Sequence, residues 1–239
     1  MKKIFSAALL SLFFAASVIA QDISSQVKEM DLVKKILVEV NDKFIEARDM
    51  GSVYEIIIEQ TGKKGILYAT KDGKYIILGS LLDKDKNNIT RDRFNELNKI
   101  EFSQLPLQDA ILIKKGNGNK KLVMFTDVDC PFCKKAHNWL KEQTDYTLYV
   151  FLIPLPMHQN APEKSVKVLC SENKIEALDN AKNDKEINGA KCAEGEEMLK
   201  KHKALADKFN VTGTPLFITA DGAKIEGFNQ QSIEAYLKK

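Results

Sequence analysis

The feature that most constrains the fold is an apolar run, Leu122 to Phe125, which is soon followed by Cys130-Pro131-Phe132-Cys133. A run with no polar alternation is typical of a strand that is covered on both faces. Proline is favoured at the first position of a helix, where a missing N–H leaves no bond unmade. We therefore expect a central strand, a turn, and a helix whose first turn carries two cysteines.

The segments around this unit define its order of elements. Strands are expected at Ala110 to Ile113, at Leu148 to Ile153, at Leu216 to Thr219 and in a short run to Phe228. A long helical stretch with Cys170 and Cys192 follows the second of these strands, and the chain closes with a helix ending at Leu237. The turn signal Asp221-Gly222 separates the last two strands. Strand, helix, strand, helices, hairpin and helix is the order of the thioredoxin fold.

The N-terminal part of the chain has a different pattern. Apolar residues recur at helical spacing, with Gly51 as a breaker after them: Val27, Met30, Val33, Leu37 and Val40. Strand-like runs follow at Val53 to Glu59, Gly65 to Thr70 and Tyr75 to Leu78. A helix and a sheet of this size bury little surface, so we expect a partner surface. From Thr90, a fair N-cap, helical spacing resumes and indicates a linker helix.

The first residues are predicted to be a cleaved secretory signal peptide. Met1-Lys2-Lys3 is basic, Ile4 to Ile19 is apolar, and Val18-Ile19-Ala20 offers a cleavage site after Ala20. A transmembrane anchor is the alternative, but the run is at the short limit for crossing a bilayer. Export makes disulfides possible among the four cysteines.

The charge pattern gives no indication of nucleic-acid binding. Without Lys2 and Lys3 the formal charge falls from +3 to +1. Lysines alternate with acidic residues, as in Lys182-Asn183-Asp184-Lys185-Glu186, which predicts a solvated mixed surface.

The spacing of Cys130 and Cys133 favours thiol-disulfide chemistry, which needs no metal or other cofactor. With Cys130 at the N-cap, the unpaired N–H groups of the first turn and the helix dipole stabilise a thiolate on its sulfur. Cys130 would be the nucleophile, and Cys133 would resolve the mixed disulfide.

Three other uses of this pair are weighed against that chemistry. A zinc site would need a second pair of close ligands, which Cys170 and Cys192 do not form. Haem attachment would need a histidine where Lys134 stands. A purely structural disulfide at this spacing closes a small ring and adds little stability.

Other polar and cysteine residues are expected to be structural. Cys170 and Cys192 would close a loop of about 22 residues, worth roughly 3 kcal/mol in the chain-entropy model. His137 lies two turns after Cys130 and is expected on a helix face rather than as a proton shuttle. Asp127 and Asp129 precede Cys130 closely enough to tune it, but we expect solvated capping carboxylates.

Gly213-Thr214-Pro215 precedes a predicted strand. By itself, a proline at the start of a strand is common and indicates no function. In a chain with an upstream cysteine pair it suggests more. A cis Thr214-Pro215 peptide beside the cysteines would aim backbone groups at an incoming chain, which would pair like an added strand.

These residues resemble the periplasmic disulfide isomerases of the DsbC and DsbG type. The likeness rests on Phe125 to Lys134, on Val211 to Pro215, on the Cys170 to Cys192 interval, and on Gly65 to Gly79 in the N-terminal part. The resemblance implies an α+β protein with a thioredoxin-like catalytic domain that carries a helical insertion, and a small cystatin-like dimerisation domain. The implied divisions are a signal peptide (1–20), a dimerisation domain (21–89), a linker helix (90–106) and the catalytic domain (107–239).

The resemblance also implies the partners and the site. It implies a periplasmic homodimer that acts on misfolded exported proteins with non-native disulfides and is kept reduced by an inner-membrane donor of the DsbD type. By motif, Cys130 is the nucleophile and Cys133 the resolving thiol. Thr214 and Pro215 form the substrate-binding element, and the structural disulfide joins the other two cysteines.

Pro131-Phe132 is closer to the Pro-Tyr of DsbG than to the Gly-Tyr of DsbC, and this dipeptide helps to set the reduction potential. A sulfenic-acid reductase and chaperone of the DsbG kind is therefore an alternative, as is a thiol oxidase of the DsbA kind. Thr214 before the proline favours the members that work in the reduced state. A non-catalytic holdase or metal carrier is a further alternative.

Overall fold

The computed structural model describes residues 23–238. The chain divides into two compact units, Met1–Asn98 (unit 1) and Lys99–Lys239 (unit 2). The signal peptide predicted for residues 1–20 lies outside the described residues. Within the described part of the chain, no helix is long and apolar enough to cross a membrane.

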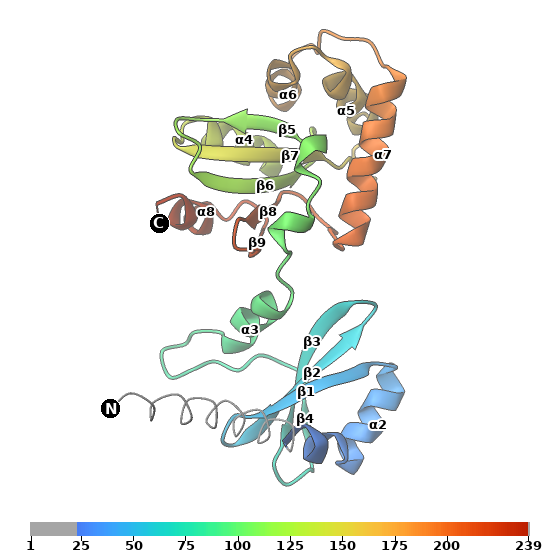
Figure 1. Cartoon of the computed structure of the whole chain (residues 1–239), viewed down its shortest axis with the longest axis vertical. Coiled ribbons are helices and arrows are strands. Elements are labelled where there is room, and N and C mark those ends of the chain that lie inside the picture. The colour runs from blue at the N-terminus through green and yellow to red at the C-terminus, as the bar shows by residue number, and fades with distance from the viewer. Residues whose placement is uncertain (1–22, 239) are drawn as a thin grey trace, which may run out of the picture. The chain divides into compact units, whose positions relative to one another are not determined.

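Unit 1 is a helix packed on a four-stranded antiparallel sheet with the order β1-β2-β3-β4 (Figure 1). Its elements are α2 (Asp31–Val40), β1 (Lys43–Asp49), β2 (Val53–Gln60), β3 (Lys63–Thr70) and β4 (Ile76–Ile77). Val33 of α2 packs with Ile56 of β2 and Leu67 of β3, which face each other in register. Burial of these apolar side chains holds the helix against one face of the sheet.

Two features of unit 1 differ from the sequence prediction. The helical pattern from Val27 to Val40 is interrupted at Met30, which is extended, so residues 23–28 and 31–40 form separate helical segments. Strand β1 was not predicted at all. A register shift between Phe44 and Glu46 breaks the apolar alternation by which a half-buried strand is recognised in a sequence.

Helix α3 (Ile89–Leu97) begins one residue before Thr90, and the prediction of Thr90 as its N-cap was wrong. The side chain of Asn88 caps the helix by accepting a hydrogen bond from the Arg91 N–H. The Thr90 hydroxyl instead accepts from the Leu81 N–H at 2.8 Å and lies 2.6 Å from the Tyr68 hydroxyl. After α3, the chain to residue 109 contains two 3-10 turns, Phe102–Gln104 and Leu107–Asp109.

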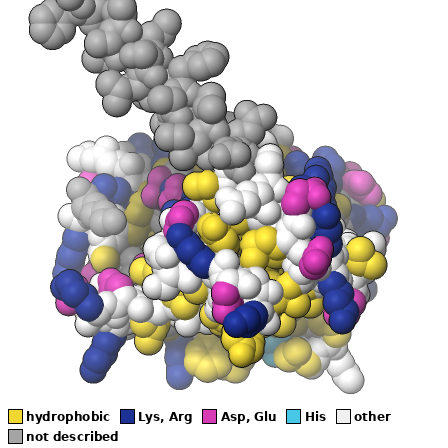
Figure 2. All heavy atoms as spheres, turned by 90° about the horizontal axis from the view of Figure 1, so that it is seen from below, with side chains coloured by type: hydrophobic (Ala, Val, Ile, Leu, Met, Phe, Trp, Pro, Cys, Tyr) yellow, Lys and Arg dark blue, Asp and Glu magenta, His cyan; other side chains and the backbone are white. Residues whose placement is uncertain are grey.

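Unit 1 leaves large hydrophobic side chains exposed. In the face of unit 1 seen in Figure 2, hydrophobic side chains gather at the centre, with lysine, arginine and acidic side chains around them. The exposed large hydrophobic residues of this unit are Val38, Tyr75, Leu78 and Leu82. Large exposed apolar patches are typical of interaction sites.

Unit 2 is built on a five-stranded sheet with the order β5-β7-β6-β8-β9, in which β6 and β7 are parallel. The strands are β5 (Ile111–Lys114), β6 (Lys120–Thr126), β7 (Tyr146–Leu152), β8 (Leu216–Thr219) and β9 (Lys224–Glu226). The helices are α4 (Pro131–Lys141), α5 (Ala161–Cys170), α6 (Lys174–Lys182), α7 (Ala193–Lys208) and α8 (Gln230–Lys238). Helices α5 to α7 form an insertion between β7 and β8 (Figure 1).

The central strand β6 is covered on both faces, which confirms the prediction from its apolar run. Leu122 and Met124 belong to a core cluster that includes residues of α4 and α8, whereas Val123 and Phe125 belong to a second cluster with residues of α7. Successive side chains of a strand point to opposite faces, so an uninterrupted apolar run is required here. The α+β thioredoxin-like architecture with a helical insertion is also confirmed.

Candidate active site: a cysteine pair at a helix N-terminus

The cysteine pair lies where β6 passes into α4. Cys130 is the N-cap residue of α4, and Pro131 occupies the first helical position. Both Cys130 and Cys133 are free thiols and both are buried. The side chain of Phe132 between them is 61% exposed, so it offers an apolar surface beside the sulfur atoms. The helix dipole and the open N–H groups of the first turn favour negative charge at this end of α4.

The loop before β8 brings Thr214 and Pro215 to the same place. The Cys130 thiol donates to the Thr214 carbonyl oxygen at 3.5 Å, although the two residues are 84 positions apart. The peptide bond between Thr214 and Pro215 is cis. The Thr214 Oγ1 atom is buried and makes no hydrogen bond with any described residue. Its hydroxyl is therefore available to a thiolate on Cys133.

Two kinds of influence act on the ionisation of Cys133, in opposite directions. Burial raises the pKa of the Cys133 thiol, whereas the charge of Lys182 lowers it, as do the groups that can donate to a thiolate there, the Thr126 and Thr214 hydroxyls and the Asp127 backbone. Burial prevails, and the pKa lies above its ordinary value. Cys133 thus depends on these four neighbours for any thiolate character.

Lys182 is a part of this site that the sequence analysis misplaced. The run from Lys182 to Glu186 was expected to be solvated, but Lys182 is 1% exposed. Its ammonium group donates to Thr126 Oγ1 and to the Asp127 carbonyl oxygen, both at 2.6 Å. Burial lowers the pKa of Lys182 to about 8, against the opposing charges of Cys133, Asp127 and Cys130. The alternation of charges around this lysine gave no signal of its burial.

Asp127 is also buried, and the expectation of a solvated capping carboxylate was wrong for it. Its Oδ2 atom accepts from the Leu155 N–H at 2.6 Å and lies 2.8 Å from His158 Nδ1. Its Oδ1 atom accepts from the Asp129 N–H at 2.8 Å. Asp127 therefore ties the segment before the cysteines to the loop that follows β7. Asp129 itself is paired with Lys164 at 2.6 Å.

Cys170 and Cys192 form a disulfide that lies apart from the cysteine pair. Cys170 ends α5 and Cys192 is the N-cap of α7, so the bond joins the two helices that flank α6. Helix α6, which carries Lys182, lies within the loop that this disulfide closes.

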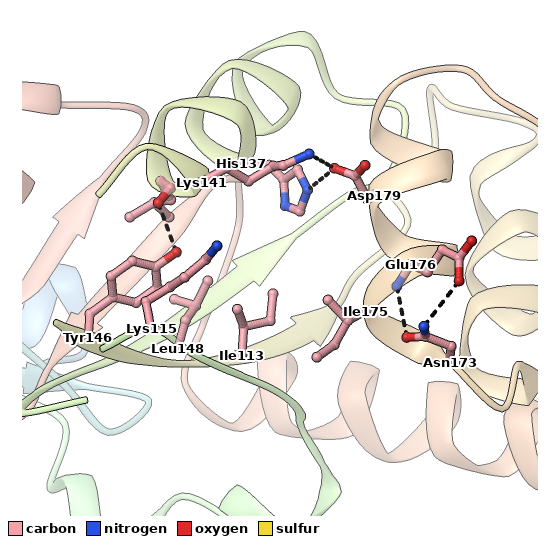
Figure 3. Close-up of a pocket in the computed structure, with 11 residues that line it drawn as sticks. Ile113, Lys115, His137, Lys141, Tyr146, Leu148, Asn173, Ile175, Glu176 and Asp179 are labelled. Atoms are coloured by element: carbon pink, nitrogen blue, oxygen red, sulfur yellow. Dashed lines mark hydrogen bonds and ion pairs between the residues drawn. The ribbon is translucent and has the colours of Figure 1, made fainter. Parts of the chain in front are cut away.

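His137 faces a cavity of 430 Å³ between α4, α6 and the edge of the sheet (Figure 3). Its Nε2 atom lies 3.2 Å from Asp179 Oδ1, which also accepts from Lys141. Ile113, Leu148 and Ile175 line the apolar side of the cavity. Burial lowers the pKa of His137 to about 4 despite Asp179, so the ring is neutral at physiological pH. Neither Cys130 nor Cys133 lines this cavity.

Within the described residues, histidine, cysteine and acidic side chains form no group of three or more that could hold a metal ion. The buried ionisable groups at the cysteine pair are two thiols, the Lys182 ammonium and the Asp127 carboxylate. This set can stabilise and exchange thiolates.

Comparison with known proteins identifies the family of unit 2. Residues 107–239 match the family model of the thioredoxin-like domain, so the chain belongs to the thioredoxin-like proteins. Residues 20–91 match the disulfide bond isomerase protein N-terminal domain. The two matches follow one another along the chain, and the curated relatives that it resembles are named as DsbC thiol:disulfide interchange proteins.

Individual relatives show how far the similarity extends. A probable thiol:disulfide interchange protein DsbC from Bordetella avium is 33% identical over 68% of this chain and 58% of its own length. The DsbC protein of Salmonella typhimurium is 28% identical over 72% of this chain and 73% of its own. The crystal structure of a disulfide interchange protein from Neisseria gonorrhoeae superposes with a TM-score of 0.51 and 27% identity, covering 56% of this chain and 97% of that one.

Proposed function

We propose that this protein reduces and isomerises incorrect disulfides in exported proteins through Cys130 and Cys133. The observation that carries the proposal is the free Cys130 thiol at the start of α4, 3.5 Å from the Thr214 carbonyl oxygen. A peptide that pairs with the backbone at Thr214 would bring its own disulfide to the Cys130 sulfur.

The proposed reaction begins when the Cys130 thiolate attacks one sulfur of a substrate disulfide. The bond from Cys130 to that sulfur forms, the substrate S–S bond breaks, and the second substrate sulfur leaves as a thiolate. In isomerisation, a substrate thiolate then attacks elsewhere and Cys130 is released with no net change in oxidation state. In reduction, Cys133 attacks Cys130, so that the substrate gains two electrons and the pair becomes a disulfide.

The test of this proposal is the refolding of a scrambled, multi-disulfide ribonuclease. We expect the wild type to speed the return of ribonuclease activity and the Cys130→Ala variant to give no gain. Equal rates with the two proteins would contradict the proposal. Alkylation of thiols in intact cells adds a second criterion, because a pair trapped in the oxidised form would favour a thiol oxidase instead.

We further propose that unit 1 forms a homodimer in the periplasm, which places two cysteine pairs on one substrate. The exposed hydrophobic side chains of unit 1 support this, as does the position of β4 at the edge of its sheet. A sheet edge has unpaired backbone groups that another chain can use. A reductant of the DsbD type at the inner membrane would return the pair to its dithiol form.

Gly79 follows the edge strand β4 and provides a test of the dimer. A Cβ atom at Gly79 meets no atom within 4 Å, so a larger side chain is tolerated within the protomer. We expect Gly79→Arg to give a folded monomer that keeps dithiol reductase activity and loses isomerase activity. Sedimentation decides this: a monomeric wild type, or a dimeric variant that isomerises normally, would show that this edge is not the interface.

A further inference from the structure

Among the residues that the structure describes, Lys182 is the only buried lysine. It is the last residue of α6, and its ammonium group bonds to Thr126, the last residue of β6, and to Asp127, which follows it. A buried ammonium costs several kcal/mol of desolvation, and a long apolar side chain at this position would avoid that cost. The position therefore calls for an explanation beyond packing.

The hydrogen bonds of Lys182 also orient its neighbour. An ammonium group has three donors and no acceptor, so Thr126 Oγ1 must accept from Lys182. The hydrogen of the Thr126 hydroxyl is then free to point to another acceptor. A hydrogen bond from Thr126 would lower the pKa of the Cys133 thiol, so the Cys133 sulfur is the acceptor that this hydrogen can serve. Lys182 thus orients the Thr126 hydroxyl so that it can donate to a thiolate on Cys133.

We propose that Lys182 is a positioning residue for the resolving step, in which its ammonium group stabilises the Cys133 thiolate by its charge and through the Thr126 hydroxyl. This inference rests on the proposed function. Other charged and titratable groups act on Lys182 as well: Asp127 after β6, Lys134 on α4, and Cys130 at the N-cap. The charge of Lys182 also lowers the pKa of His137 on α4. Among the groups whose charge raises the pKa of Lys182, Cys133 contributes most.

The step balances within the site and the substrate. In the mixed disulfide, the Cys133 thiol loses its proton and its thiolate attacks Cys130 Sγ. The S–S bond between Cys133 and Cys130 forms as the bond from Cys130 to the substrate sulfur breaks. The substrate leaves as a thiolate and takes a proton from water, so the substrate is reduced by two electrons and the cysteine pair is oxidised. Lys182 keeps its charge opposite the thiolate until the new bond forms.

The size of the effect follows from two opposing contributions. An opposite charge close to an ionisable group lowers or raises its pKa by about 1 to 3, so removing Lys182 decreases the Cys133 thiolate roughly 10- to 1,000-fold. The thiolate that remains is more nucleophilic, because reactivity rises with pKa by a Brønsted coefficient of about 0.4–0.5. The net expectation is a resolving step that is about 3- to 60-fold slower.

A chromogenic aryl disulfide separates the two steps in the full-length protein. Attack by Cys130 releases a first coloured thiolate at a rate proportional to reagent concentration. Attack by Cys133 then releases a second one at a rate that does not depend on it. We expect Lys182→Met to slow this second phase about 3- to 60-fold at neutral pH and to move its pH midpoint upward. The exposed Lys174 at the start of α6 supplies the matched control, Lys174→Met, in which neither phase changes.

A structural role alone would not move the pH midpoint of the second phase. If Lys182→Met does not fold, Thr126→Val keeps the lysine but removes the hydroxyl, and we expect a smaller slowing with a midpoint displaced in the same direction. A folded Lys182→Met or Thr126→Val protein whose second phase keeps the wild-type rate and midpoint would overturn the inference. Absence of the first phase from the wild type would instead refute the proposed function on which the inference depends.

Discussion

Acid should destabilise unit 2 through His137, whose ring is buried between α4 and α6. Burial lowers its pKa from 6.5 in the unfolded chain to about 4 in the folded protein. Between these two pH values the unfolded chain binds a proton that the folded protein does not bind. The free energy of unfolding therefore shows no loss from His137 above pH 6.5, and it decreases as the pH is lowered from 6.5 towards 4. Each unit of pKa difference corresponds to about 1.4 kcal/mol, so the full loss is roughly 3 kcal/mol.

Urea unfolding at a series of pH values measures this loss, with His137→Gln as the comparison. Trp139, the single tryptophan of the chain, lies in α4 against Phe228 and reports on unit 2 by fluorescence. Glutamine can keep a hydrogen bond to Asp179 but does not titrate. We expect the wild type to lose roughly 3 kcal/mol more than the variant between neutral pH and pH 4. Parallel losses in the two proteins would refute the assignment of this acid sensitivity to His137.

Two further perturbations test the scaffold of the site. Replacing Cys170 and Cys192 by alanine opens a crosslink of sequence separation 22, and the chain-entropy model predicts a loss of ~3 kcal/mol in urea unfolding; a loss below about 1 kcal/mol would contradict that model here. The Asp127 carboxylate accepts from two backbone N–H groups and lies beside His158 Nδ1. Asp127→Asn puts an amide in its place, so we expect the free energy of unfolding to fall by roughly 1–3 kcal/mol. An Asp127→Asn protein as stable as the wild type would show that the loop before the cysteines does not depend on these bonds.

The sequence by itself determined the elements whose signals are local. The apolar run of β6 required cover on both faces, and proline after Cys130 required a helix start, because strand pleating and proline geometry act over adjacent residues. Strand β8, Leu216–Thr219, was predicted with its observed bounds for the same reason. Strand β1 was missed because its register shift depends on pairing with β2, which no local pattern records.

Only the tertiary structure decided which polar side chains are buried beside the sulfur atoms. Lys182 and Thr126 are 56 positions apart, and their meeting depends on how α6 packs against the end of β6. In the sequence, Lys182 stands in a polar charged run, and Asp127 resembles an ordinary capping carboxylate. Charge and polarity are properties of a residue, whereas the desolvation and the fields that shift a pKa are properties of its surroundings in the folded chain. The positions of the two cysteines were therefore predictable, but the groups that control the second of them were not.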